Sequence, residues 1–146
     1  MTMATVGTFS AQGVTAGVAV PIDAPSMALL REMESAPFML NVTATGGAGT
    51  DTLDVYVQHS VDGVVWDDFI HFTQLTVANA VATKVIANWV AEVIPSTPLK
   101  TVAPGTLAVG VQQGPTGEQV RLFLKVAGTT GTFTGSVVAG ICSDAD

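Results

Sequence analysis

The chain has 146 residues, with 12 acidic and five basic side chains and a net charge of −7 at neutral pH. The basic residues are scattered, so no cluster could neutralise several phosphates, and we expect neither nucleic-acid binding nor attraction to an anionic membrane. These residues are Arg31, Lys84, Lys100, Arg121 and Lys125. The single cysteine, Cys142, excludes an intrachain disulfide, and we expect it to be a small buried residue.

The hydropathy pattern indicates neither a membrane span nor a secretory signal. No segment reaches the ~18 uninterrupted apolar residues of a membrane helix. The first residues lack a charged region followed by an apolar one. We therefore expect synthesis in a cytosol, with any external location reached by assembly or lysis.

The surface is expected to carry few charges. Charged residues make up 12% of the chain, against about 25% in an ordinary soluble domain. Either the surface is rich in Thr, Ser, Gln and Gly, or part of it is apolar and covered by other subunits. The composition is compatible with both interpretations.

The first 36 residues contain two uncertain segments. Residues 1–20 are uncharged and form either a first strand around Thr5–Phe9 or a flexible arm that orders against a neighbour. Residues 21–146 are expected to form a single β-sandwich domain. Within them, residues 27–34 favour a short helix with Ser26 as its N-cap, although a strand is an equal alternative.

The middle of the chain predicts a strand over 38–45 and then a hairpin over 53–75. Its turn is Val61-Asp62-Gly63, because Asp-Gly between alternating runs is a strong hairpin signal. Strict alternation gives each arm one apolar face. The first arm presents Leu53, Val55, Val57 and His59, and the second presents Trp66, Asp68, Ile70 and Phe72.

Four further strands are predicted in the second half. They cover 81–94, 107–112, 119–126 and 132–141. The first of these is ambiguous, because its β-branched residues favour a strand while its Ala, Lys and Glu residues tolerate a helix, and the strand is the favoured interpretation. In the third of these, Val120, Leu122 and Leu124 point inward and Arg121 and Lys125 outward. Seven or eight strands joined by Gly- and Pro-rich turns indicate an all-β antiparallel sandwich or jelly roll, with at most one short helix.

The hairpin carries the chain's clearest local motif. Ser60-Val-Asp62-Gly63-Val-Val-Trp66 resembles the Asp-box turn of sialidase-type propellers, S-x-D-x-G-x-x-W, with one residue missing. A single copy cannot build a propeller. We interpret it as a structural turn in which Asp62 accepts backbone N–H groups.

Candidate chemical residues also gather on the hairpin. His59 and His71 lie on opposing arms, with Asp67 and Asp68 near by, but a metal site needs three or four converging ligands. Asp54, Asp62, Asp67 and Asp68 are crowded, and we expect them to be solvated or bonded to local amides. We predict no catalytic, cofactor-binding or metal-binding residue, and no enzymatic activity.

Three aromatic residues leave a choice open. Tyr56, Trp66 and Trp89 could form an exposed platform on which a sugar stacks, as in carbohydrate-binding sandwiches. Because aromatic residues are mostly buried and Trp66 falls on the apolar face of its strand, core packing is the favoured interpretation.

Two blocks of the chain resemble small virion structural proteins of tailed bacteriophages. They are DVYVQHSVDGVVWDDFIHF (54–72) and QVRLFLKVAGTTGTFTGSVV (119–138). The first matches a V-x-V-Q-x-S-x-D-G-x-x-W-x-D hairpin, and the second a V-R-x-x-x-x-V-x-G-T strand pair. Size, acidity and β pattern are most similar to capsid decoration (cement) proteins.

This resemblance implies a non-enzymatic protein on the capsid exterior that bridges major capsid protein subunits. It also implies a homo-oligomer, a trimer or a dimer, in which residues 1–20 are a candidate for reaching an adjacent subunit. Two alternatives remain: a carbohydrate-binding or host-adhesion module, and a tail or head-completion component.

Overall fold

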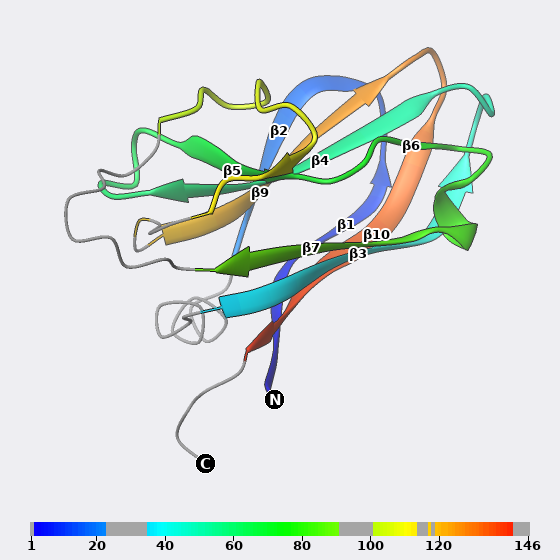
Figure 1. The fold of residues 1–146 in the computed structure, drawn as a ribbon. Coiled ribbons are helices and arrows are strands. Elements are labelled where there is room, and N and C mark those ends of the chain that lie inside the picture. Colours follow the sequence, from blue (N-terminus) through cyan, green and yellow to red (C-terminus); the bar gives the residue numbers. More distant parts are fainter. Residues whose placement is uncertain (1, 23–34, 91–100, 114–116, 118, 142–146) are drawn as a thin grey trace.

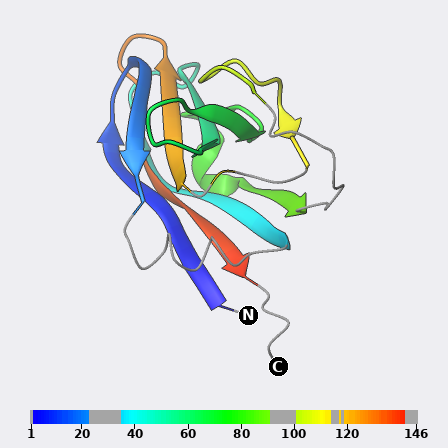
Figure 2. The same cartoon turned by 90° about the vertical axis from the view of Figure 1, so that its left-hand side faces the viewer.

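A computed structural model of the chain describes residues 2–22, 35–90, 101–113, 117 and 119–141. In this part of the chain, two antiparallel sheets pack face to face, as Figures 1 and 2 show from two sides. The predicted all-β class and antiparallel sandwich are therefore confirmed. The strands are β1 (Thr2–Gln12), β2 (Thr15–Pro21), β3 (Ser35–Gly46), β4 (Thr52–Ser60), β5 (Asp67–His71), β6 (Leu75–Thr76), β7 (Lys84–Val90), β8 (Gly110–Val111), β9 (Gln119–Ala127) and β10 (Thr132–Ile141).

The strands divide into a four-stranded and a larger sheet. The four-stranded sheet has the order β1-β10-β3-β7 and is the lower layer in Figure 1. The six-stranded sheet has the order β2-β9-β4-β5-β8, with β6 added beside β4. A short 3₁₀ turn, η1 (Ala80–Ala82), precedes β7. The observed strands exceed the expected seven or eight because residues 2–21 form two of them and because the two-residue β6 was not expected; of the strand expected over 107–112, only the two residues of β8 are extended.

The core lies between the sheets and follows the period-two alternation of their strands. The inward side chains of β9 are Val120, Leu122, Leu124 and Val126, each at most 3% exposed, as the alternation predicts. Aromatic rings join the layers at one end. Phe69 of β5 meets Phe38 of β3 and Trp89 of β7 edge to face, with ring centroids 5.9 and 6.2 Å apart.

A β-bulge changes the faces of the predicted hairpin. Val57 pairs with Ile70 but Gln58 pairs with Asp68, so Phe69 is an extra residue on β5. Phe69 and Ile70 therefore both belong to the core, whereas Asp68 lies on the outer side of the sheet beside Gln58. The expectation that Trp66, Asp68, Ile70 and Phe72 share one face was wrong, because it assumed unbroken alternation.

Both faces of β4 are buried, which alternation alone does not predict. Its inward residues pack in the core, and Tyr56 and Gln58 on the other face are 4% and 0% exposed. Residues 101–107, here called the outer loop, cross this outer side of the six-stranded sheet, as the yellow trace in Figure 1 shows. Over this part of the sandwich the protein is thus three layers thick.

The N-terminal segment forms strands in both sheets. β1 pairs with β10 and β2 pairs with β9, so residues 2–21 belong to the sandwich itself. The structure thus shows the strand alternative and not a free arm, and the expected boundary at residue 20 falls inside β2. The predicted helix at 27–34, residues 91–94 of the 81–94 strand and the burial of Cys142 lie outside the described residues.

Candidate functional site

The carboxylate of Asp68 is fully buried and accepts four hydrogen bonds. Three come from consecutive backbone N–H groups of the outer loop, at Gly105 (3.1 Å), Thr106 (2.9 Å) and Leu107 (3.1 Å). The fourth comes from Gln58 Nε2 at 2.8 Å. A buried carboxylate is stable only when its oxygens are occupied in this way. Asp68 therefore ties the outer loop to β5.

Two further side chains fasten the same loop. Lys125 Nζ donates to the carbonyl of Gly105 at 2.6 Å, and Asp67 Oδ1 accepts the N–H of Val102 at 3.0 Å. Gly105 has a φ of +69°, and a Cβ at this position would lie 2.4 Å from Lys125 Cε. Glycine is thus required where the loop meets β9.

A chain of contacts runs from Asp68 to the surface. Gln58, which is fully buried, donates to Asp68 and accepts a bond from Arg121 Nε at 2.8 Å. The guanidinium of Arg121 then lies over the ring of Trp66, 4.2 Å from its centroid, a cation–π contact. Burial lowers the pKa of Arg121, while the charge of Asp68 acts in the opposite direction. Every link of this chain is occupied by a neighbour within the protein.

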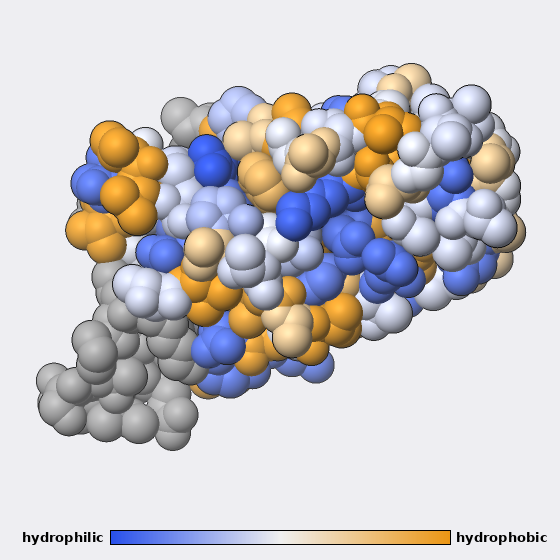
Figure 3. Space-filling model, turned by 90° about the horizontal axis from the view of Figure 1, so that it is seen from above, coloured by the Kyte–Doolittle hydropathy of each residue, from blue (hydrophilic) through white to orange (hydrophobic). Residues whose placement is uncertain are grey.

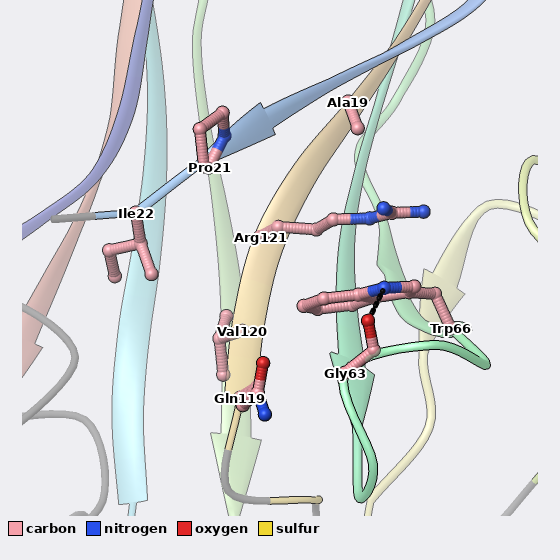
Figure 4. Close-up of a pocket in the computed structure, with 8 residues that line it drawn as sticks. All are labelled: Ala19, Pro21, Ile22, Gly63, Trp66, Gln119, Val120 and Arg121. Carbon is pink, nitrogen blue, oxygen red and sulfur yellow. Dashed lines mark hydrogen bonds between the residues drawn. The ribbon is translucent and has the colours of Figure 1, made fainter. Parts of the chain in front are cut away.

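Trp66 and Arg121 also border a small open pocket of about 270 Å³ between β2, β9 and the hairpin turn. Figure 4 shows the guanidinium lying parallel to the indole, with Pro21 and Ile22 on the opposite side of the pocket. Its remaining lining residues are Ala19, Gly63, Gln119 and Val120. The guanidinium covers one face of the indole, so that face is not open to a stacking ligand.

The Asp62 turn has the local bonding predicted from its sequence. Asp62 Oδ1 accepts the N–H groups of Val64 and Val65, both at 2.8 Å, and a bond from Ser60 Oγ at 3.1 Å. Gly63, at φ +76°, donates its N–H to Ser60 Oγ at 2.8 Å. The backbone bond from Val65 and the other bonds hold the pKa of Asp62 below its usual value. The Asp-box interpretation as a structural turn agrees with this geometry.

The same turn fixes Trp66 and exposes apolar side chains. Trp66 Nε1 donates to the carbonyl of Gly63 at 3.3 Å. Val61, Val64 and Val65 are 64, 80 and 61% exposed. The turn is therefore a well-bonded support whose tip presents three valines to solvent.

His71 connects β5, β4 and the outer loop. Its Nε2 lies 2.9 Å from Asp54 Oδ1, its Nδ1 lies 2.8 Å from the carbonyl of Leu107, and its ring stacks on Tyr56 at 4.1 Å. The hydrogen bond with His71 lowers the pKa of Asp54, with a further contribution from Gln74. Burial, followed by the charges of Asp54 and Asp68, raises the pKa of Tyr56 to about 12.

The two histidines of the hairpin do not converge. His59 packs on the inner side against Phe69, with ring centroids 5.7 Å apart, and its Nδ1 accepts the N–H of Gly117 at 2.9 Å. His71 lies on the outer side, as its contacts with Tyr56 and the outer loop show. Among the residues that the structure describes, no group of three or more His, Cys, Asp or Glu side chains is arranged to hold a metal ion.

The three aromatic residues considered as a sugar platform are separate. Trp89 is 2% exposed in the core, and Tyr56 is 4% exposed beneath the outer loop. Trp66 is half-buried beside Arg121 and outside the core, so its predicted core position was wrong. The reason is that β5 begins at Asp67, after Trp66, and the turn directs the indole onto β9.

Sequence reasoning missed a second buried carboxylate, Asp51. It is 5% exposed, and its Oδ2 accepts the N–H groups of Thr129, Thr130 and Gly131 at 3.0, 2.9 and 2.6 Å. The bond from Thr130 is the largest influence lowering the pKa of Asp51, and it prevails over burial. An aspartate next to a Gly-rich loop was visible at 46–51, but its partner turn lies about 80 residues away.

The outer side of the four-stranded sheet is a different kind of surface. Its four strands contain one charged residue, Lys84, and no acidic residue. The register places side chains in rows that cross all four strands. One row is Thr5, Val138, Met39 and Ile86, and the next is Thr8, Ser136, Asn41 and Lys84. We call these two rows the four-stranded face.

Comparisons of this chain with protein-family models, curated proteins and solved structures find no match. In the described ranges, no helix has both the length and the apolar character needed to cross a membrane.

Proposed function

We propose that this chain is a non-enzymatic structural protein of a bacteriophage virion, decorating the outside of the capsid. It bridges neighbouring subunits of the major capsid protein and acts as a homo-oligomer, a dimer or a trimer. It is made in the host cytoplasm and is active on the assembled shell. The resemblance of residues 54–72 and 119–138 to small virion proteins is the starting point of this proposal.

The observation that carries the proposal is the four-stranded face. Interface cores are depleted in charged residues, and this face has only Lys84 although the whole chain carries −7. The first of its two rows combines the exposed Ile86 with the half-buried Met39 and Val138. We assign the contact with the major capsid protein to this face.

The use of the polar side chains supports a structural role. Asp68 and His71 fasten the outer loop, Asp62 closes the hairpin turn, and Asp51 closes the turn at 128–131. Each of these groups is occupied by hydrogen-bond donors or acceptors of the loop or turn that it fastens, as expected of side chains that stabilise loops. The sandwich is thereby a firm support for a contact surface.

A lattice makes weak individual contacts sufficient. Two rows of side chains on four strands form a small patch, well below the ~800 Å² per partner of a standard interface. Many copies on one shell, each linked to its neighbours, raise the effective concentration of every contact. The proposed role therefore needs only modest affinity at each face.

The first experiment is to count copies per particle by quantitative mass spectrometry of purified virions. Hundreds of copies in a simple ratio to the major capsid protein support decoration. A few dozen copies or fewer would instead support a location in the tail or at a head vertex. Absence from particles would overturn the virion proposal.

A second experiment tests the assigned face. A Met39→Glu/Ile86→Glu variant places two carboxylates in the first row of this face, and we expect it to lose co-sedimentation with undecorated shells. The matched control, Val64→Glu/Val65→Glu, adds the same charge at the exposed hairpin tip and should still bind. Equal loss in both variants would reject the four-stranded face as the contact.

A further inference from the structure

Among the described residues the two sheets end in four edge strands, and three of these edges are protected against further pairing. β1 pairs with β10 through a register that is interrupted twice, between Thr5 and Gly7 and between Phe9 and Gln12. β2 has one such irregularity and ends at Pro21, and β8 is only two residues long. Bulges, proline and short length are the devices by which natural sheets avoid edge-to-edge association.

The fourth edge strand, β7, lacks these devices. It pairs with β3 from Asn41 and Lys84 to Ser35 and Val90 without a register shift, and it contains no proline and one charge. It lies at one end of the four-stranded sheet, as Figure 2 shows, and no described strand pairs with its other edge. A regular, nearly uncharged edge of seven residues is a template for a further strand.

The free edge of β7 is open over its first half. The N–H of Val90 and the carbonyl of Asn88 are bonded to the side chain of Gln113, at 2.7 and 2.9 Å. Alternate residues of an edge strand direct their backbone groups to the same side, so Lys84 and Ile86 face the same outer edge as Asn88. The backbone groups available for a further strand are therefore centred on Ile86.

We propose that β7 pairs antiparallel with β7 of a second copy, across a two-fold axis that passes beside Ile86, perpendicular to the sheet. The choice of a second copy rests on the homo-oligomer of the proposed function and on the symmetry of this strand. Two identical strands form the same contact from both sides only when they run antiparallel, and such a contact closes at two copies. The inference therefore selects a dimer over a trimer.

The pairing centred on Ile86 brings compatible residues together. Ile86 lies opposite Ile86 of the second copy, which covers part of an apolar side chain that is 60% exposed in the single chain. Lys84 lies opposite Asn88, so no like charges meet. A contact centred further along the strand would depend on the Asn88 and Val90 groups that Gln113 already occupies.

The dimer joins two four-stranded faces into one surface. Residues directly opposite each other in an antiparallel pair project from the same side of the sheet. The row Thr5, Val138, Met39 and Ile86 therefore continues through Ile86 of the second copy, and both faces point the same way. The six-stranded sheets of the two copies lie together on the opposite side. Each dimer thus presents two faces to a shell and leaves no open β7 edge.

An open pocket leaves room beside this edge. It has a volume of about 200 Å³ and lies between β7 and the segment that contains β8. Val85 and Ala87 line it from β7, and Val109 and Val111 line it from the other side. The inward side chains of a second β7 strand would meet this apolar lining, which adds contact area to the backbone hydrogen bonds.

The first test is the mass of the purified full chain without shells, by sedimentation equilibrium over a range of concentrations. We expect twice the 14.9 kDa of one chain at high concentration. A monomer at every concentration, or a trimer, would overturn the proposal. Because no shell is present, the result is independent of the capsid role, which the copy number in virions tests.

Amide hydrogen exchange locates the contact without any variant. The Ile86 N–H faces the outer edge and should exchange fast in the monomer, whereas the N–H groups of Val85 and Ala87 face β3 and are protected in both states. An amide that exchanges only from the monomer slows about tenfold once ~90% of the chains are paired. A dimer whose Ile86 exchange does not depend on concentration would overturn the assignment to β7.

Two charge variants test the same contact by mass. Ile86→Lys places two ammonium groups opposite each other across the axis, and we expect a monomer where the unmodified chain is dimeric. The matched control, Met39→Lys, adds the same charge one strand further in. There the two copies of the residue are about 14 Å apart, three strand spacings, and the chain should stay dimeric. Equal dissociation of both variants, or none in Ile86→Lys, would reject this interface.

A strand of the major capsid protein is the alternative occupant of the edge. In that case the purified chain stays monomeric, and its Ile86 amide gains protection only on undecorated shells. That result would overturn pairing with a second copy and give the β7 edge to the capsid contact.

Discussion

The outer sides of the two sheets differ in both charge and cover. The six-stranded sheet contains Asp54, Asp67, Asp68, Arg121 and Lys125, and the outer loop crosses it. Viewed from this side, hydrophilic residues gather near the middle of the surface (Figure 3). The strands of the four-stranded sheet contain one charged residue, Lys84. The apolar side chains of Met3, Ile86 and Val90 on this sheet remain 48 to 60% exposed.

The difference teaches how this chain uses its few charges. Buried charged groups need specific hydrogen-bond partners. Here the partners of Asp68 are backbone N–H groups of the outer loop, and these bonds hold the loop on the sheet. One side of the sandwich is therefore completed from within the chain. The other side carries almost no charge, which agrees with the contact with the major capsid protein proposed for it.

The largest expected effect on stability comes from removing Asp68. Asp68→Ala leaves three loop N–H groups and Gln58 without an acceptor in a buried site, which costs about 3 kcal/mol or more. Denaturant unfolding should show this loss, and hydrogen exchange should show an open outer loop. Asp68→Asn keeps one acceptor oxygen and should lose less. A stability change below that of an ordinary surface substitution would mean that the loop is not held by this carboxylate.

A smaller loss is expected from separating Arg121 and Trp66. Arg121→Met removes a hydrogen bond to Gln58 and a cation–π contact, together about 1–2 kcal/mol. Arg121→Lys keeps the charge but cannot stack on Trp66 and bond Gln58 with the same geometry. It should therefore retain only part of the stability that Arg121→Met loses. Thermal unfolding measures both variants. Full recovery by lysine would show that charge alone matters at this position.

Acid should lower the stability of the described fold through three aspartates. The pKa values of Asp51, Asp54 and Asp62 are all lowered by hydrogen bonds in the folded state. A lowered folded pKa contributes stability above the ordinary value near 3.8, and this contribution is lost as pH falls through the folded pKa. The denaturant concentration at the midpoint of unfolding, measured from pH 7 to pH 2, should decrease once the pH falls below the ordinary aspartate pKa. Asp51→Asn should flatten part of the slope, and an unchanged slope would remove Asp51 from the set.

The hairpin turn should respond only locally. Asp62→Ala removes the acceptor of the Val64 and Val65 N–H groups, so their exchange should accelerate while core amides keep their protection. Amide exchange read residue by residue provides the measurement. Ser60→Ala removes the bond from Gly63 and the bond from Ser60 Oγ to Asp62 but keeps the acceptor of the two valine N–H groups, so it should produce a weaker version of the same change. Exchange that spreads to β4 and β5 would show that the turn supports the whole hairpin.

The smallest effect on stability is expected on the four-stranded face. Met39→Glu/Ile86→Glu changes surface side chains and should shift the free energy of unfolding by within about 0.5 kcal/mol per site. The contrast with Asp68→Ala then separates the two sides of the sandwich: one matters for folding and the other for the proposed capsid contact. A large loss of stability here would mean that the face is structural, not a contact surface.

Local patterns predicted much of the fold. The alternation of residues 119–126 correctly predicted the inward side of β9, and the Asp-Gly signal correctly located the turn of the hairpin. The extra residue at Phe69 could not be recognised, because a bulge leaves the composition of a strand unchanged. That one residue decided which side Asp68 occupies.

The polar network was harder to predict than the strands. Asp68 and its loop donors are separated by 37 to 39 residues, and Gln58 and Arg121 by 63. No local spacing connects such residues, since their contact follows from sheet register and loop path. The acids of the hairpin were expected to bond local amides. This holds for Asp62, but Asp68 binds distant ones.

The pairing of β1 with β10 has a mechanical consequence. The two strands are antiparallel, with Thr2 opposite Ile141, so both leave the sheet at the same end. A force that separates these two residues pulls the inter-strand hydrogen bonds apart one after another, because those bonds lie perpendicular to the strands. Bonds that are loaded one at a time break at low force. Pulling Thr2 and Ile141 apart should therefore separate β1 from β10 far more easily than pulling the two strands along their length in opposite directions.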